Sequence, residues 1–242
     1  MLRPVPDPRE EPKAGPACPI GVCDGSGWIL RDDDTAEPCE CREQMIGRAV
    51  SRGMGTGVPK RFRGVSLERK PICDLHPSLL RHVRGFVRGI DENLDAGRGL
   101  WFGGDVGTGK TSLAMLVALA AERAGRSVAI YSVTRLLAEI KDTYDSQSGE
   151  SYMRLFRRLC SVDLLQLDDL GAEKRTEWVL EQLYAIVNER WQDQRSIVIT
   201  TNITDLDELR DQVGARTVSR LVEICGDPLP IMRPDLRVTA GG

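Results

Sequence analysis

The sequence predicts an α/β protein in which a parallel sheet is flanked by helices and preceded by a small cysteine-rich module. Three observations lead to this prediction. Short apolar runs alternate with amphipathic segments from residue 99 onward. An octet typical of phosphate binding joins the first apolar run to the following helix, and four of the seven cysteines lie between residues 18 and 41.

The first segment, residues 1–17, is expected to be a disordered tail, because it holds five prolines, many charges and no periodic apolar pattern. It also has no apolar core of a signal peptide. No apolar run approaches the ~18 residues that a membrane-spanning helix needs. We therefore expect a cytoplasmic protein with no membrane contact. The net charge of −3 excludes a general attraction to nucleic acid, so such contacts need a local patch.

Residues 18–57 are expected to form a zinc-binding module and a linker. Clustered cysteines in a reducing cytoplasm favour a metal over disulfides. Two thiolate pairs around a glycine-rich turn provide the donors of a tetrahedral Zn²⁺ site. The four candidate ligands are Cys18, Cys23, Cys39 and Cys41. The alternative is a set of reduced cysteines that bind no metal, or in which one of the four is a bystander.

Residues 58–242 are expected to form the main domain. Residues 76–94 have the apolar spacing of a helix. The segments that follow are predicted as a strand at 99–104, a helix at 110–125, a strand at 127–132, a helix at 133–145, a loop at 146–151, a short helix at 152–160, a strand at 162–171, a helix at 176–194, a strand at 195–202 and one or two helices at 204–225. Strands separated by helices indicate a parallel sheet covered on both faces.

The octet GDVGTGKT, residues 104–111, fits the pattern of a phosphate-binding loop between a strand and a helix. Its glycines allow backbone N–H groups to surround phosphate oxygens, and the helix that follows directs its positive end at the same anion. Lys110 is predicted to reach the terminal phosphates of ATP, and the Thr111 hydroxyl to bind Mg²⁺. The expected nucleotide-binding residues are Gly104, Asp105, Val106, Gly107, Thr108, Gly109, Lys110, Thr111 and Ser112.

Two later strands are expected to end in polar side chains that bind Mg²⁺, the attacking water or the γ-phosphate. In LLQLDDLG, Asp168 is predicted to hold the Mg²⁺ shell and Asp169 to polarise the attacking water. Asp169 is one methylene shorter than the glutamate common at this position, so hydrolysis is expected to be slow. Asn202, at the end of IVITTN, is a candidate to bind the water or the γ-phosphate. The alternative is that these residues only form solvated turns.

Three arginines are candidates for sensing the γ-phosphate. Arg216 and Arg220 are four residues apart and share a helix face. An arginine supplied by a neighbouring subunit stabilises the transition state, so hydrolysis would depend on self-assembly. The alternative is a solvated face with Asp211 or Glu223 as ion partners. Arg237 is a candidate to sense phosphate within its own chain.

The motifs GLWFGGDVGTGKTSLA, LLQLDDLGAE, VNERW, ITTN and ARTVSRL together resemble the AAA+ ATPases of bacterial helicase loading, the DnaC and DnaI type. The IstB-type transposition ATPases share this core. The resemblance covers residues 58–238. It implies an AAA+ sheet, ATP hydrolysis, ATP-dependent self-assembly through a trans arginine, and binding to single-stranded DNA and to a hexameric, DnaB-type replicative helicase in replication initiation.

The resemblance also implies where macromolecules bind. In such proteins the segment between the second strand and the acidic strand often touches DNA, and here it offers Lys141, Tyr144, Arg154, Arg157 and Arg158. A solvated pair of helices is the competing interpretation. Loaders carry N-terminal cysteine modules of related spacing and use their N-terminal region to grip the helicase. The first cysteine pair is wider here than in that pattern.

Three functions remain open at this point. The first is an ATP-dependent helicase loader that releases its partners on hydrolysis. The second is an IstB-type transposition helper on duplex DNA, which the cysteine module disfavours. The third is a nucleotide-gated adaptor with negligible turnover, which Asp169 leaves open.

Overall fold

The computed structural model describes residues 18, 20–31, 35–42, 45, 57–145 and 150–232. The chain divides into two compact units, residues 1–46 and residues 47–242. The predicted tail and most of the predicted linker lie outside the described residues. Across the described ranges, no helix is long and apolar enough to cross a membrane.

The first unit contains a short antiparallel hairpin of β1 (Trp28–Leu30) and β2 (Ala36–Pro38), in which Trp28 faces Pro38. The guanidinium carbon of Arg42 lies 3.9 Å from the centroid of the Trp28 ring. Among the residues of this unit that the structure describes, the buried apolar side chains are those of Cys39 and Cys41. The hairpin is therefore organised around thiols rather than around an aliphatic core.

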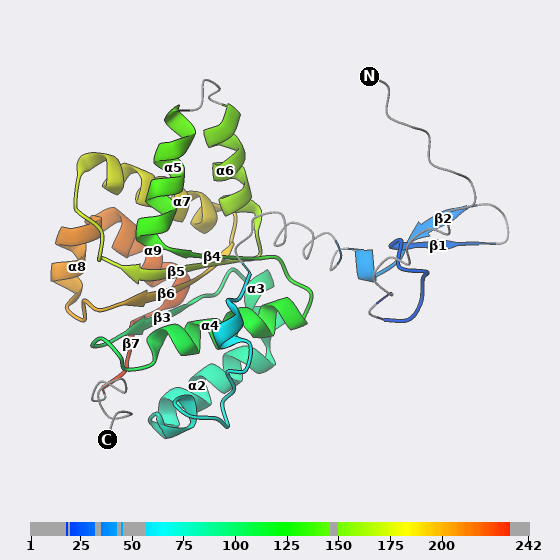
Figure 1. The fold of residues 1–242 in the computed structure, drawn as a ribbon, viewed down its shortest axis with the longest axis horizontal. Helices are drawn as coiled ribbons and strands as arrows, with labels where there is room; N and C mark the ends of the chain where they lie inside the picture. Colours follow the sequence, from blue (N-terminus) through cyan, green and yellow to red (C-terminus); the bar gives the residue numbers. More distant parts are fainter. Residues whose placement is uncertain are drawn as a thin grey trace. The chain divides into compact units, whose positions relative to one another are not determined.

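The second unit contains a five-stranded sheet whose strands are all parallel (Figure 1). Their order is β4 (Val128–Ser132), β5 (Leu164–Leu170), β6 (Ser196–Thr201), β3 (Leu100–Gly103) and β7 (Leu229–Pro230). Because the strands are parallel, their carboxyl ends meet at one edge of the sheet. The chain order reverses beside β3, and ligands of such sheets bind at this kind of switch point.

Helices cover both faces of this sheet (Figure 1). One face packs against α2 (Pro77–Arg88), α3 (Ile90–Asp95) and α4 (Lys110–Arg123), together with the 3-10 turns η1 (Lys60–Phe62) and η2 (Ile72–Asp74). The other face packs against α5 (Val133–Asp145), α6 (Glu150–Ser161), α7 (Glu177–Gln192), α8 (Leu206–Val213) and α9 (Ala215–Cys225). The predicted α/β class with a helix-flanked parallel sheet is confirmed.

The structure differs from the sequence prediction in two elements, while the segment predicted as one or two helices at 204–225 forms two that meet at Gly214. The helix predicted over 76–94 is interrupted at Gly89, where ψ is +37°, and forms α2 and α3. Strand β7 was not predicted, because two paired residues are too few to give a periodic signal.

The fully buried guanidinium of Arg190 joins α7 to the sheet and to α6. It donates hydrogen bonds to the carbonyl oxygens of Leu159 at 2.6 Å, Cys160 at 3.3 Å, Asp163 at 3.2 Å and Ser196 at 2.6 Å. Burial lowers the pKa of Arg190 to about 9, which leaves the guanidinium charged at neutral pH. These carbonyls end α6 or flank β5 and β6, so a single side chain satisfies acceptors from three elements.

Candidate functional site

The phosphate-binding loop lies between the end of β3 and the start of α4, as predicted. At Gly104 the φ angle is +152°, and a Cβ would lie 2.4 Å from the carbonyl oxygen of Ile231, so only glycine fits there. Gly109, at the N-terminus of α4, has a φ of +102°. The loop therefore depends on glycine both for its turn and for its contact with β7.

The side chain of Lys110 is buried and points back along this loop. Its ammonium donates hydrogen bonds of 2.7 Å to the carbonyl oxygens of Gly104 and Asp105. The hydroxyl of Thr108 donates a 2.8 Å hydrogen bond to the same Asp105 carbonyl. The loop and the lysine thus hold each other in place. When a phosphate binds, its oxygens would replace the two carbonyl oxygens as acceptors for the Lys110 ammonium.

A cavity of about 880 Å³ opens in front of this loop. Of the predicted loop residues, Val106, Gly107, Gly109, Lys110, Thr111 and Ser112 line it. Asp168, Asp169 and Asn202 line the same cavity, so the structure brings together predicted residues from β3–α4, β5 and β6. The helix dipole of α4 favours an anion at this position.

The carboxylate of Asp168 lies directly beside Thr111. The Thr111 hydroxyl is 3.1 Å from Oδ1 and 3.3 Å from Oδ2 of Asp168, and the hydroxyl of Thr200 is 2.7 Å from Oδ1. Burial raises the pKa of Asp168, with the hydrogen bonds from Thr200 and Thr111 acting against it. A half-buried hydroxyl and carboxylate this close provide oxygen ligands of the type that Mg²⁺ prefers.

A bulge in β5 places both aspartates in one cavity. Leu167 pairs with Ile199 and Leu170 pairs with Thr201, so three steps along β5 match two along β6. Asp169 takes a φ of +58° within this bulge. Neighbouring side chains on a regular strand point to opposite faces, and the extra residue removes that alternation.

Several residues that line the cavity or bond its aspartates were missed by the sequence analysis. Thr200 is fully buried, and its hydroxyl also accepts the backbone N–H of Asp169 at 2.9 Å. Its signal was the hydroxyl residue two positions before Asn202. Ser132 and Arg135, after β4, line the cavity as well, and so do Arg61 and Phe62 from η1. No motif distinguishes these four from ordinary surface and core residues.

The two predicted trans arginines lie on α9, outside the lining of this cavity. Arg216 is exposed, with its guanidinium carbon 5.9 Å from the centroid of the Tyr184 ring. Arg220 stacks on Trp191 at 3.5 Å and pairs with Glu223 at 2.8 Å. Glu223 was the ion partner weighed for this face. Arg237 lies outside the described residues.

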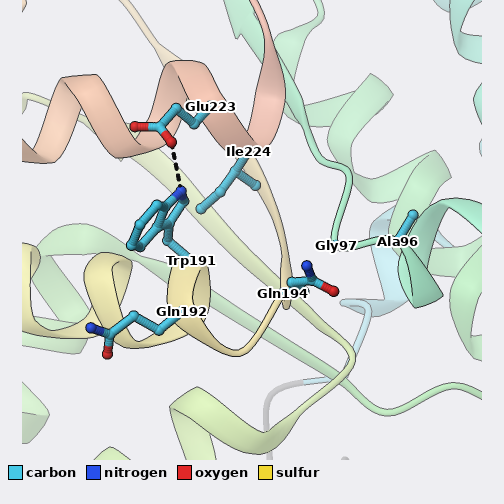
Figure 2. Close-up of a pocket in the computed structure, with 7 residues that line it drawn as sticks. All are labelled: Ala96, Gly97, Trp191, Gln192, Gln194, Glu223 and Ile224. Carbon is cyan, nitrogen blue, oxygen red and sulfur yellow. Dashed lines mark hydrogen bonds between the residues drawn. The ribbon is translucent and has the colours of Figure 1, made fainter.

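Trp191 and Glu223 also line a second cavity, of about 490 Å³, between the end of α7 and the end of α9 (Figure 2). The indole N–H of Trp191 donates a 2.8 Å hydrogen bond to Oε2 of Glu223. Glu223 therefore contacts both Trp191 and Arg220 within the chain.

Helices α5 and α6 pack side by side and extend beyond the sheet (Figure 1). The rings of Tyr144 and Tyr152 stack with centroids 5.6 Å apart, and Tyr144 meets Trp178 edge-on at 6.3 Å. The ammonium of Lys141 lies 5.1 Å from the Trp178 centroid. Of the predicted DNA contacts, Lys141, Tyr144, Arg154 and Arg157 are exposed and Arg158 is half-buried. Trp178 and Tyr152 were not predicted as part of this group.

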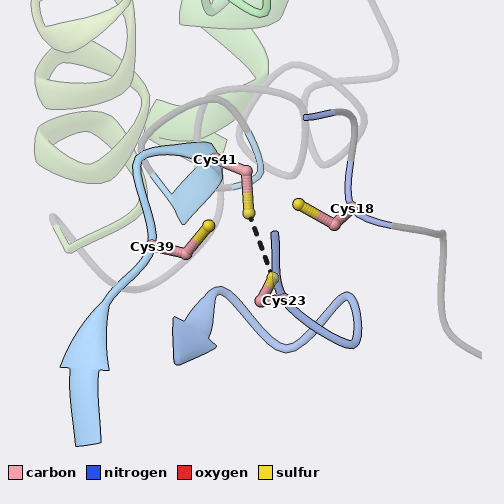
Figure 3. Close-up of side chains that lie close together, drawn as sticks. All are labelled: Cys18, Cys23, Cys39 and Cys41. Atoms are coloured by element: carbon pink, nitrogen blue, oxygen red, sulfur yellow. Dashed lines mark hydrogen bonds between the residues drawn. The ribbon is translucent and has the colours of Figure 1, made fainter. Parts of the chain in front are cut away.

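In the first unit, the four clustered cysteines converge on one point (Figure 3). Their sulfur atoms all lie within 4.8 Å of one another, and those of Cys23 and Cys41 are 3.5 Å apart. A tetrahedral Zn²⁺ with Zn–S bonds of ~2.3 Å requires sulfurs about 3.8 Å apart. The donor set therefore fits zinc.

Backbone hydrogen bonds near the cluster favour a thiolate at Cys18, whereas burial raises the pKa of Cys41. The N–H of Gly25 donates to the sulfur of Cys23 at 3.4 Å. The backbone N–H of Cys23 lowers the pKa of Cys18 to about 6, so its thiolate forms at neutral pH. The thiolate is the form that binds a metal.

Comparisons with known proteins match the chain to one family and to named relatives. The model of the IstB-like ATP binding protein family matches residues 94–220. The replicative helicase loader DnaC of Escherichia coli (strain K12) is 29% identical over 183 residues, which cover 75% of this chain and 71% of that protein. The replicative helicase loader DnaC of Buchnera aphidicola subsp. Baizongia pistaciae is 31% identical over 180 residues, which cover 74% of this chain and 69% of that protein.

Solved structures show the same fold. The crystal structure of the DnaC helicase loader matches with a TM-score of 0.60 at 26% identity, over 72% of this chain and 100% of that chain. The crystal structure of DnaI matches with a TM-score of 0.54 at 22% identity, over 78% of this chain and 92% of that chain.

Proposed function

The chain belongs to the IstB/DnaC-like family of AAA+ ATP-binding proteins, and from this premise we propose that it is an ATP-dependent loader of a replicative helicase. In this proposal it binds ATP–Mg²⁺, single-stranded DNA and a hexameric helicase, and hydrolysis releases the partners. The observation that carries the proposal is the single cavity lined by Lys110, Thr111, Asp168, Asp169 and Asn202.

Each of these side chains has a role in the proposed hydrolysis. The Lys110 ammonium, now on loop carbonyls, transfers to the β- and γ-phosphates of ATP. The hydroxyl of Thr111 and the carboxylate of Asp168 would hold Mg²⁺, which neutralises charge on the phosphates. Asp169 and Asn202 orient the attacking water.

Hydrolysis is expected to be slow, because the short side chain of Asp169 must reach the water from a strained backbone. The rest of the catalytic set would come from a neighbouring subunit, through Arg220 or Arg216. Arg220 must first leave Glu223 and Trp191, whereas Arg216 is already exposed. Self-assembly with ATP would therefore accelerate turnover.

The surface formed by α5, α6 and the start of α7 supports binding of single-stranded DNA. Tyr144 is 54% exposed, so its ring can stack on a base beside the Lys141 ammonium. Stacking on aromatic side chains with nearby cations is how single strands are bound without sequence preference.

The cysteine module supports binding of a protein partner. Four of its large apolar side chains are exposed: Ile20 at 42%, Val22 at 56%, Trp28 at 38% and Leu30 at 78%. Exposed apolar groups gathered in so small a unit favour a protein contact. We assign this contact to the helicase, with Zn²⁺ holding the module in shape.

Affinity capture tests the proposal. The tagged chain is mixed with the replicative helicase of its own host, with and without ATP–Mg²⁺, and with a single-stranded oligonucleotide. We expect a ternary complex that Lys110→Ala weakens and that Cys41→Ser removes, whereas Cys73→Ser leaves it intact. Absence of any helicase complex, together with ATP-dependent filaments on duplex DNA, would instead support a transposition helper.

A nucleotide-gated adaptor is the second candidate, and the aspartate at position 169 favours it. A loader and an adaptor differ in how fast they release phosphate from ATP, which can be measured on the same mixtures. Release no faster than that of Lys110→Ala, with ATP binding intact, identifies the adaptor.

A further inference from the structure

A buried carboxyl group lies close to the catalytic aspartate pair without belonging to it. Glu173 is 6% exposed, although Ala172, Lys174 and Arg175 beside it are exposed. It sits in the loop between β5 and α7, four residues after Asp169. Glutamate is almost never buried without a specific partner, so its contacts call for an explanation.

The Glu173 carboxyl group closes the turn that follows Asp169. Its Oε2 accepts the backbone N–H of Gly171 at 3.0 Å. The backbone N–H of Ala172 donates to the carbonyl oxygen of Asp169 at 3.2 Å. Among the described residues, the buried Oε1 has no hydrogen-bond partner. Burial raises the pKa of Glu173, and the hydrogen bond to Gly171 acts against that shift.

The same turn fits tightly against residues near Asn202 and on α8. Gly171 has a φ of +93°, and a Cβ there would lie 2.7 Å from Cδ1 of Ile203 and 3.4 Å from Cδ1 of Leu209. Ile203 directly follows Asn202, and Leu209 is buried within α8. A shift of this turn would therefore move against both neighbours.

A hydrogen bond also connects the turn to α8. The side-chain amide of Gln212 donates to the backbone carbonyl of Glu173 at 2.6 Å. Gln212 lies near the end of α8, and α9 with Arg216 follows after Gly214. Glu173 thus contacts the aspartate turn through its side chain and α8 through its backbone.

We propose that Glu173 is a positioning residue for ATP hydrolysis, holding the Asp169 turn at a fixed place against α8. The inference rests on the proposed function, because it concerns the step that Asp169 performs. Asp169 has a backbone conformation that residues other than glycine keep only when the surrounding structure enforces it. Glu173 and Gln212 supply part of that enforcement.

The test compares steady-state ATP hydrolysis and ATP affinity in the full chain. We expect Glu173→Ala to lower kcat by between about tenfold and a hundredfold, with the Kd for ATP within about twofold. Glu173→Gln keeps an acceptor for Gly171 and should retain most of kcat. Gln212→Ala should fall between them. Glu181→Ala, an exposed change on α7, is the matched control and should leave kcat unchanged.

Hydrogen exchange gives a readout that does not need turnover. Peptides covering residues 169–173 should exchange faster in Glu173→Ala, while peptides of the phosphate loop stay protected. Should Glu173→Ala not fold, Glu173→Met, which fills the volume without an acceptor, and Gln212→Ala carry the test.

Two outcomes overturn the inference alone. One is that folded Glu173→Ala or Glu173→Met hydrolyses ATP with the same kcat as the wild-type protein. The other is an equal loss in Glu173→Gln, which would show that charge matters and the acceptor does not. If the wild-type protein binds ATP but releases no phosphate, the proposed hydrolysis is contradicted instead. The rate of hydrogen exchange at residues 169–173 in Glu173→Ala, compared with wild type, then shows whether Glu173 holds the turn in place.

Discussion

The buried hydroxyl of Thr200 donates a 2.7 Å hydrogen bond to Oδ1 of Asp168. The hydroxyl oxygen of Thr200 in turn accepts a hydrogen bond from the backbone N–H of Asp169 at 2.9 Å. One side chain on β6 thus fixes the direction of one carboxylate and the backbone of the other. Because Thr200 lies across from the β5 bulge, its loss should change both groups together.

Thr200→Val keeps the shape of the side chain and removes the hydroxyl. We expect Mg²⁺-dependent ATP hydrolysis to fall on the order of tenfold, because the Asp168 carboxylate and the Asp169 backbone N–H each lose a partner that orients them. ATP binding without Mg²⁺ should not change, since Lys110 and the loop are untouched. Phosphate release and calorimetry measure these two quantities, and a loss of metal-free ATP affinity would contradict the assigned role.

Lys110→Met should weaken ATP binding without unfolding the chain. Hydrogen bonds to charged groups contribute about 1.5–3 kcal/mol each, which corresponds to roughly tenfold to a hundredfold in affinity. Calorimetric titration with ATP measures the change. Lys174→Met, at an exposed position in the loop after β5, is the control. An ATP affinity equal to that of wild type would place the triphosphate elsewhere.

One Zn²⁺ per chain is expected from the four convergent thiols. A thiol-reactive agent with a metal indicator should release a single equivalent, and Cys41→Ser should lower that content. Cys73→Ser should not, because Cys73 lies outside the cluster. Chelation should unfold residues 18–42, since so small a unit has few other buried groups. A zinc content near zero in protein purified under reducing conditions would refute the site.

Glu173 gives a pH dependence whose sign follows from its raised pKa. Below the ordinary value of 4.5 the carboxyl is neutral in both folded and unfolded chains, and its full contribution to stability is present. As the pH rises through the raised folded pKa, that contribution is lost, because the folded state resists ionisation. Glu173→Gln stays neutral throughout. Its Tm relative to wild type should therefore increase from pH 4 to pH 8, and a constant difference would argue against a raised pKa.

Arg190→Met should be among the most destabilising single substitutions in the second unit. The carbonyl oxygens of Leu159, Cys160, Asp163 and Ser196 lose a buried donor. Each unsatisfied buried group costs about 1–3 kcal/mol, so a total loss of about 3 kcal/mol or more is expected. Urea unfolding measures it.

Arg195→Met is the matched control for this substitution. Its side chain is 40% exposed and pairs with Asp163 at 3.1 Å, so the expected cost is below about 1 kcal/mol. Equal losses in the two variants would mean that the buried hydrogen bonds of Arg190 contribute nothing specific.

Much of the nucleotide site could be predicted because its chemistry is local in the chain. A phosphate loop needs glycines, a lysine and a hydroxyl within eight residues, so the octet identifies its own function. The end of an apolar strand likewise marks Asp168 and Asp169. The partners of these residues could not be predicted in the same way. Thr200 lies on β6 and Arg135 on α5, and their local sequence does not show that the first bonds Asp168 or that the second lines the cavity.

The sequence by itself determined the class of fold, the phosphate loop, the acidic strand end and the set of four thiols, because each is written as a local pattern of residue types. Only the tertiary structure decided that the bulge in β5 turns both aspartates into one cavity, that Arg220 lies on Trp191 within its own chain, and that Glu173 points inward. The physical reason is that these outcomes depend on pairing and packing between segments distant in the chain. The residues adjacent in sequence do not specify which distant side chain fills the space beside them.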